Sequence, residues 1–151
     1  MAQPLKILIV AASFYEDIAD EMKQGAIAAF DAAQVSYDVI EVAGAFEIPA
    51  AIGFAHQAGL NGTIEAYDGF MGLGCVIRGE TSHYDYVCGE SARGLMDLSV
   101  QKQIAVVNGI LTVENRDQAM ARARQSEKNK GGDIAEALLG MIALKQQYGL
   151  A

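Results

Sequence analysis

Two patterns of apolar and polar residues alternate along the chain. Residues 5–11 form a continuous apolar run interrupted only by Lys6, which is typical of a strand covered on both faces. Residues 16–34 instead repeat apolar side chains at four-residue spacing, which predicts an amphipathic helix. The two patterns recur in turn to the end of the chain, so alternating strands and helices are predicted throughout.

The remaining predicted elements follow the same logic. Further strands are expected over residues 35–42, 69–77 and 104–111, and further helices over 49–58, 84–100, 115–126 and 133–147. Pro49 stands at a first helical position, which proline favours. Asn115 with Gln118, and Asp133 with Glu136, have the spacing of capping boxes that start the last two helices. Strands separated by helices pair in parallel. The predicted fold class is therefore α/β: a three-layer α/β/α sandwich with a four-stranded parallel sheet and helices on both faces.

Length and composition narrow the class of protein. A chain of 151 residues predicts a single domain over residues 1–151. Hydrophobic residues make up 52% and charged residues 20%, which excludes intrinsic disorder. The net charge of −8 argues against nucleic acid as a partner. This apolar excess, with 16 glycines and few charges, also points to surface that is covered in a homo-oligomer.

The expected compartment follows from the start of the chain and its cysteines. The apolar start weakly resembles a signal peptide, but its run is short and contains Lys6, so it is interpreted as a strand. No apolar stretch reaches the length of about 18 residues that a membrane span needs. Cys75 and Cys88 are too few for a disulfide framework. A cytoplasmic protein without membrane association is expected.

The expected place for chemistry is one edge of the predicted sheet, because ligands of open parallel sheets bind outside the carboxyl ends of the strands. Four segments lie at this edge. Residues 13–17, 43–49 and 78–84 follow predicted strands, and residues 108–115 include the end of the last predicted strand. These segments are also the richest in polar and conformationally special residues. We therefore expect them to converge on a single ligand site.

The segment RGETSHYD, residues 78–85, has the highest density of chemically useful groups. Gly79 lets the backbone approach a ligand closely. Thr81 and Ser82 offer hydroxyls and free N–H groups just before a helix, where an anion is favoured. His83 carries an imidazole, the side chain best suited to proton transfer near neutral pH. The alternative is a helix N-cap followed by an exposed histidine with no chemical role.

Three other positions carry candidate binding groups, each with a structural alternative. Glu47, in the apolar segment AGAFEIP, could bind a polyol hydroxyl or an amine, or cap the following helix. Phe14 could offer its flat face to a planar ring, or belong to the core. Arg122, Lys128 and Lys130 form a small positive cluster in an acidic chain. Arg122 could bind a phosphate through two hydrogen bonds, whereas Lys128 is expected to lie on a solvated helix face.

Metal and nucleotide cofactors are not predicted. Cys75, His83 and Cys88 are separated by eight and five residues, which matches no common zinc pattern. Cys75 lies within a predicted strand and is expected to belong to the core. The chain contains no G-x-x-x-x-G-K motif, and no G-x-G-x-x-G motif follows the first strand.

Five segments, in order along nearly the whole chain, together resemble the lumazine synthase family. They are SFYEDI (13–18), AGAFEIPAAI (43–52), GCVIRGETSHYDYVCGE (74–90), NGILTVENRDQAMARA (108–123) and NKGGDIAEAL (129–138). The resemblance implies a flavodoxin-like fold and a homopentamer with active sites between adjacent subunits. It also implies a transferase of riboflavin biosynthesis that needs no metal or organic cofactor. Its substrates would be 5-amino-6-(D-ribitylamino)uracil and 3,4-dihydroxy-2-butanone 4-phosphate, and its products 6,7-dimethyl-8-ribityllumazine, phosphate and water.

The resemblance also implies roles for individual residues. His83 would transfer protons. The pyrimidine and its ribityl chain would contact Phe14, Ala45, Phe46, Glu47, Cys75, Val76, Ile77 and Asn108. The phosphate would lie near Gly79, Glu80 and Thr81, with Arg122 reaching in from the neighbouring subunit and Lys130 beside it.

This sequence departs from the family pattern at three places. Asn108 replaces an aromatic residue that many members carry, so weaker binding of the pyrimidine is expected. The segment around Phe14 lacks the Arg and Asn that commonly flank it. Residues 125–128 replace a more glycine-rich stretch of shell-forming members, which favours a bare pentamer. The loss of the aromatic at Asn108 also keeps open an alternative function, a non-catalytic flavin or lumazine carrier on the same scaffold.

Overall fold

The computed structural model describes residues 3–150, and its centre is a four-stranded parallel sheet. The strands are β1 (Lys6–Ala12), β2 (Ser36–Val42), β3 (Gly69–Ile77) and β4 (Val106–Val113). They lie in the order β2-β1-β3-β4, and every neighbouring pair is parallel. The predicted α/β class, with a flavodoxin-like layout, is confirmed.

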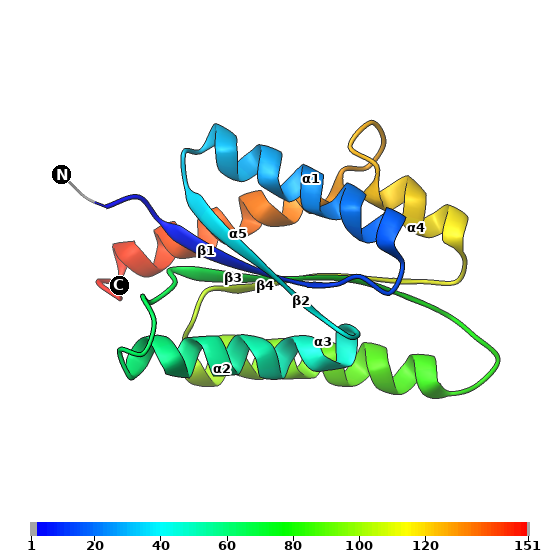
Figure 1. The fold of residues 1–151 in the computed structure, drawn as a ribbon, viewed down its shortest axis with the longest axis horizontal. Coiled ribbons are helices and arrows are strands. Elements are labelled where there is room, and N and C mark those ends of the chain that lie inside the picture. Colours follow the sequence, from blue (N-terminus) through cyan, green and yellow to red (C-terminus); the bar gives the residue numbers. More distant parts are fainter. Residues whose placement is uncertain (1–2, 151) are drawn as a thin grey trace.

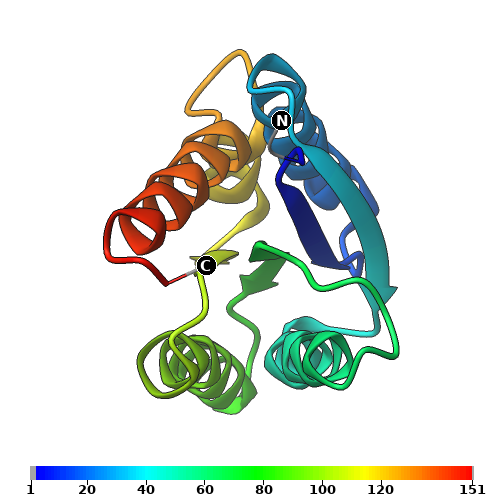
Figure 2. The same ribbon diagram turned by 90° about the vertical axis from the view of Figure 1, so that its left-hand side faces the viewer.

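Helices cover both faces of this sheet. Figure 1 shows α1 (Glu16–Ala32), α4 (Arg116–Ala123) and α5 (Lys130–Gln147) on one face. On the other face lie α2 (Ile48–Leu60), which follows a 3₁₀ turn η1 (Ala45–Glu47), and α3 (His83–Lys102). Figure 2, viewed along the layers, shows the sheet between the two groups of helices.

The continuous apolar run of β1 is explained by the two cores that it separates. Ile7 and Ile9 are fully buried among residues of α1 and α5, whereas Leu8 and Val10 are buried against α2 and α3. Successive side chains of a strand point to opposite faces, so a strand with helices on both sides must be apolar at every position. None of the helices within residues 3–150 combines the length and apolar character needed to cross a membrane.

All the predicted helices and strands are present, and the two largest boundary errors, equal in size, are at the end of α4 and at the start of α5. Asn115 caps α4 as predicted, because its side chain accepts a hydrogen bond from the Gln118 amide at 2.9 Å. The predicted capping box at Asp133 is wrong. Helix α5 begins at Lys130, and the side chain of Asn129 accepts a hydrogen bond from the Gly132 amide at 3.3 Å.

The reason for this error is a close approach between α5 and α1. Gly131 and Gly132 are buried within the first turn of α5 rather than forming a break before it. A Cβ atom on Gly131 would lie 2.1 Å from the Met22 carbonyl oxygen of α1. Glycine therefore serves here to let two helix backbones come together, which local sequence preferences do not reveal.

Candidate functional site

A cavity of about 590 Å³ opens at the carboxyl edge of the sheet, within the size range of small-molecule sites. Its lining comes from four places: the loop after β1, the segment from the end of β2 through η1, the end of β3, and the start of α3. Three of the four predicted loop segments therefore converge as expected. The residues are Phe14, Tyr15, Ala43, Gly44, Ala45, Phe46, Glu47, Cys75, Val76, Ile77, His83 and Val87.

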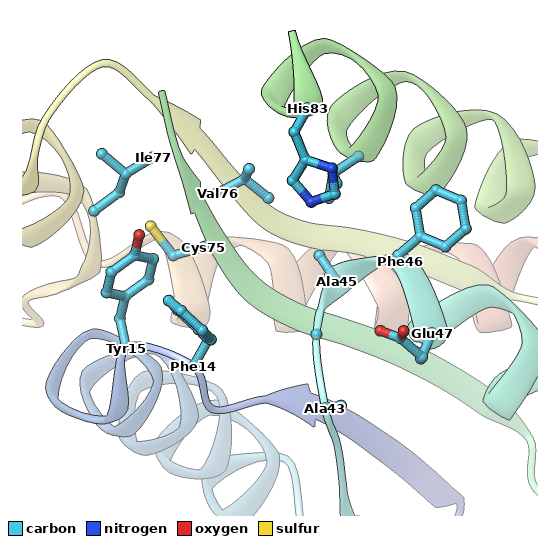
Figure 3. Close-up of a pocket in the computed structure, with 12 residues that line it drawn as sticks. Phe14, Tyr15, Ala43, Ala45, Phe46, Glu47, Cys75, Val76, Ile77 and His83 are labelled. Atoms are coloured by element: carbon cyan, nitrogen blue, oxygen red, sulfur yellow. The ribbon is translucent and has the colours of Figure 1, made fainter. Parts of the chain in front are cut away.

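Phe14 lies at the mouth of this cavity and is not a core residue. Its side chain is 75% exposed, and Tyr15 packs edge-on against it with ring centroids 5.0 Å apart. The Tyr15 ring lies 5.7 Å from the Arg116 guanidinium carbon, and Arg116 forms an ion pair with Asp17 in the first turn of α1. The Phe14 ring is thus held from one side while it stays open to a ligand (Figure 3).

Glu47 and Phe46 line the opposite side of the cavity, on η1 (Figure 3). Glu47 is the N-cap residue of α2, but its carboxylate makes no capping hydrogen bond. The structural alternative for Glu47 is therefore not observed, and its carboxylate faces the cavity. Phe46 is 54% exposed, so the site offers a large apolar surface beside this single acid.

The end of β3 forms the floor of the cavity through Cys75, Val76 and Ile77, all half-buried. Burial raises the pKa of the Cys75 thiol to about 11. A thiol with that pKa is neutral at physiological pH and is a poor nucleophile. Cys75 is therefore part of the cavity wall and packs against the core behind it.

His83 is the first residue of α3, and its imidazole points into the cavity between Val76 and Phe46 (Figure 3). Its backbone N–H donates a long hydrogen bond to Thr81 Oγ1 at 3.4 Å. Gly79, Glu80 and Thr81 precede it as an exposed loop, next to the N-terminus of α3. A helix start of this kind favours an anion.

Six of the predicted site residues do not line the cavity of the single chain. Three of them, Gly79, Glu80 and Thr81, lie in the loop before α3, and the other three are Asn108, Arg122 and Lys130. Asn108 lies in the third position of β4, pairs with Gly72 of β3, and its side chain accepts a hydrogen bond from the Ile110 amide. Arg122 lies on α4 and donates to the Gln118 carbonyl at 2.9 Å. Lys130 is exposed at the start of α5. The fold of one subunit does not bring these residues to the cavity.

The predictions missed four lining residues: Tyr15, Ala43, Gly44 and Val87. Tyr15, Ala43 and Gly44 belong to the predicted loop segments, so adjacency to Phe14 and Ala45 was a signal for them. Val87 lies one turn beyond His83 on α3, and helical spacing was its only signal. Among residues 3–150, no group of three or more His, Cys, Asp or Glu side chains is placed to hold a metal ion.

The fold and site define an α/β protein with a small-molecule cavity at the carboxyl edge of a parallel sheet, equipped with one histidine and one carboxylate. A family model described as 6,7-dimethyl-8-ribityllumazine synthase matches residues 4–146. The chain belongs to this family.

Individual relatives match over almost their full lengths. The 6,7-dimethyl-8-ribityllumazine synthase of Bartonella tribocorum is 56% identical over 95% of this chain and 91% of the relative. The 6,7-dimethyl-8-ribityllumazine synthase 1 of Rhizobium meliloti is 57% identical over 97% of this chain and 95% of the relative. The 6,7-dimethyl-8-ribityllumazine synthase of Agrobacterium fabrum is 54% identical over 99% of both chains.

Proposed function

We propose that this chain is a single-domain transferase of riboflavin biosynthesis. It condenses 5-amino-6-(D-ribitylamino)uracil with 3,4-dihydroxy-2-butanone 4-phosphate and forms 6,7-dimethyl-8-ribityllumazine, phosphate and water. Family membership over nearly the whole chain supports this activity. The observation that carries it in this structure is the apolar cavity into which His83 points.

The reaction requires the protein to position two substrates and to transfer protons. The pyrimidine amine attacks the ketone and loses water to form an imine, and phosphate is then eliminated. The second amine attacks the remaining carbonyl and loses a second water as the ring closes. Each step moves a proton, and two reactants must meet in one orientation. His83 suits the proton transfers, because its side chain reaches the cavity and histidine titrates near neutral pH.

The cavity accommodates the pyrimidine substrate in a simple arrangement. Phe14 stacks on the ring with its open face, while Ala45, Phe46 and Glu47 hold the ribityl chain and the ring edge. Cys75, Val76 and Ile77 contact the ring from the floor formed by β3. Glu47 supplies the hydrogen-bond acceptor that ribityl hydroxyls need in a largely apolar site.

The phosphate-bearing substrate lies at the exposed end of the cavity. Gly79, Glu80 and Thr81 hold the phosphate beside the N-terminus of α3, whose amide groups favour an anion. Arg122 and Lys130 lie away from the cavity of their own chain, and in this proposal they reach the site of a neighbouring subunit. Asn108 approaches the ring from the same neighbour.

This arrangement requires an oligomer, which we propose to be a bare homopentamer in the cytoplasm. Large apolar side chains exposed on α2 and α3 of the single chain support such an assembly: Phe54, Tyr86, Met96 and Val100. Light scattering should give about five times the chain mass of 16.0 kDa. A mass near sixty subunits contradicts the bare pentamer, and a monomer contradicts the shared site.

The activity is tested by mixing the purified protein with both substrates and following lumazine formation optically. His83→Ala should lower kcat by about 10²–10⁴-fold, with positioning by the rest of the site preserved. A wild-type rate equal to spontaneous condensation refutes the enzyme and leaves the carrier alternative. A His83→Ala variant with full activity refutes the role of His83. The carrier is the less favoured alternative, because proton-transfer and phosphate groups have no use in it.

A further inference from the structure

Arg78 connects the end of the sheet to the helix that carries His83. It follows β3 directly, and its backbone N–H donates to the Val113 carbonyl at 2.9 Å, which extends the pairing with β4 by one residue. Its side-chain Nε donates to Glu114 Oε2 at 2.7 Å. One side of the guanidinium is therefore fixed to the residue that follows β4.

The same guanidinium contacts the first turn of α3 with its other groups. Its central carbon lies 4.2 Å from the centroid of the Tyr84 ring, a cation–π contact. Its Nη1 lies 3.6 Å from Asp85 Oδ1. Tyr84 and Asp85 are the two residues that follow His83, so Arg78 touches the helical turn from which the imidazole projects.

The start of α3 has no side-chain cap. Its N-cap residue, Ser82, makes no side-chain capping hydrogen bond, and the bond from the His83 amide to Thr81 is long at 3.4 Å. Gly79 lies in open space, where even an added Cβ atom would meet nothing within 4 Å. The loop between Arg78 and His83 is thus exposed, and the Ser82 side chain does not cap the helix that follows it.

We propose that Arg78 is a positioning residue for His83, because its guanidinium clamps the first turn of α3, through Tyr84 and Asp85, to Glu114 after β4. This inference rests on the proposed function of the site. It requires arginine in particular: the guanidinium is planar, stacks on an aromatic face and directs its Nε–H to a carboxylate at the same time. A lysine keeps the charge but cannot make both contacts.

The test measures kcat and KM in a double-mutant cycle that combines Arg78→Met with His83→Ala. Arg78→Met should lower kcat by about 10- to 100-fold, since a small misplacement of a catalytic group has effects of this size. Arg78→Lys should lower kcat by a similar factor. In the His83→Ala background, Arg78→Met should have no further effect on kcat, because no imidazole remains to be positioned.

Arg93→Met is the matched control. Arg93 lies on the same helix and pairs with Glu90 at 2.6 Å and Asp97 at 2.8 Å, but it does not line the cavity. This variant should change kcat less than twofold. The unfolding midpoint of either arginine variant should shift by less than about 4 °C, because exposed ion pairs contribute little to stability.

Several results overturn the inference. The first is an Arg78→Met effect on kcat that is equally large with and without His83. The second is an Arg78→Met variant in which only KM changes. The third is an Arg93→Met variant that loses as much kcat as Arg78→Met. If Arg78→Met does not fold, Glu114→Gln weakens the same clamp from its other side. It should lower kcat only when His83 is present, and an unchanged kcat refutes the clamp. A wild-type protein without turnover refutes the proposed function instead, so the two failures are distinguishable.

Discussion

The close approach of α1 and α5 at Gly131 makes a quantitative prediction for Gly131→Ala. The added methyl carbon would lie 2.1 Å from the Met22 carbonyl oxygen, 2.9 Å from its carbonyl carbon and 3.1 Å from its Cα atom. These are backbone atoms inside a helix, so none can rotate away. To restore ordinary contact, α5 must move from α1 by about 1 Å or more.

The magnitude follows from two opposing effects. Forcing an extra methyl group into a packed interface costs about 1–3 kcal/mol and occasionally more, and a rigid backbone contact places this site at the upper end. Alanine gains about 1 kcal/mol over glycine in helix propensity. We expect a net loss of about 2 kcal/mol, which lowers the unfolding midpoint of a chain of this size by roughly 4–8 °C.

Gly140→Ala, on the same helix, is the matched control. Gly140 is exposed, and an added Cβ atom would meet nothing within 4 Å, so only the propensity gain applies. This variant should be more stable than the wild type by about 0.5–1 kcal/mol.

The assay is urea or thermal unfolding followed by circular dichroism. All proteins are compared at one concentration, because the stability of an oligomer depends on it. Equal midpoints for Gly131→Ala and Gly140→Ala refute the argument from close helix approach.

Three further outcomes are expected. Burial raises the pKa of the Cys75 thiol to about 11, so Cys75 should react with iodoacetamide at pH 8 about 100-fold more slowly than an ordinary thiol. Mass spectrometry follows the labelling, and rapid labelling contradicts the burial of this thiol. Asn108→Phe should bind flavin-like ligands more tightly in calorimetry, and unchanged affinity counts against a ring-stacking position. Hydrogen bonds from Lys23 and Ser13 lower the pKa of Glu41, so its stabilising effect is present above the ordinary pKa and is lost as pH falls through the lowered one. Glu41→Gln should therefore unfold below the wild-type midpoint at pH 7 but not in strong acid, and a pH-independent difference excludes this linkage.

The order of elements and the position of the cavity were predictable because they depend on local patterns. The apolar run of β1 required helices on both faces, and the parallel sheet brought the loops containing Phe14, Glu47 and His83 to one edge. The resemblance to a family implied roles for individual site residues, which the pattern of apolar and polar positions does not indicate. These roles stay predictions.

Other features were decided only by contacts between distant parts of the chain. Gly131 lies inside a helix because α1 approaches it, although glycines in sequence indicate a break. Phe14 lines the cavity rather than belonging to the core, which depends on how the loop after β1 leaves the sheet. Arg78 meets Glu114 across 36 positions of sequence. The sequence by itself determined which segments are helices and strands and which edge of the sheet carries the cavity, since periodicity and topology carry that information. The tertiary structure alone decided which backbones touch and which side chains hold His83 in place, since these depend on distances between segments that are remote in sequence.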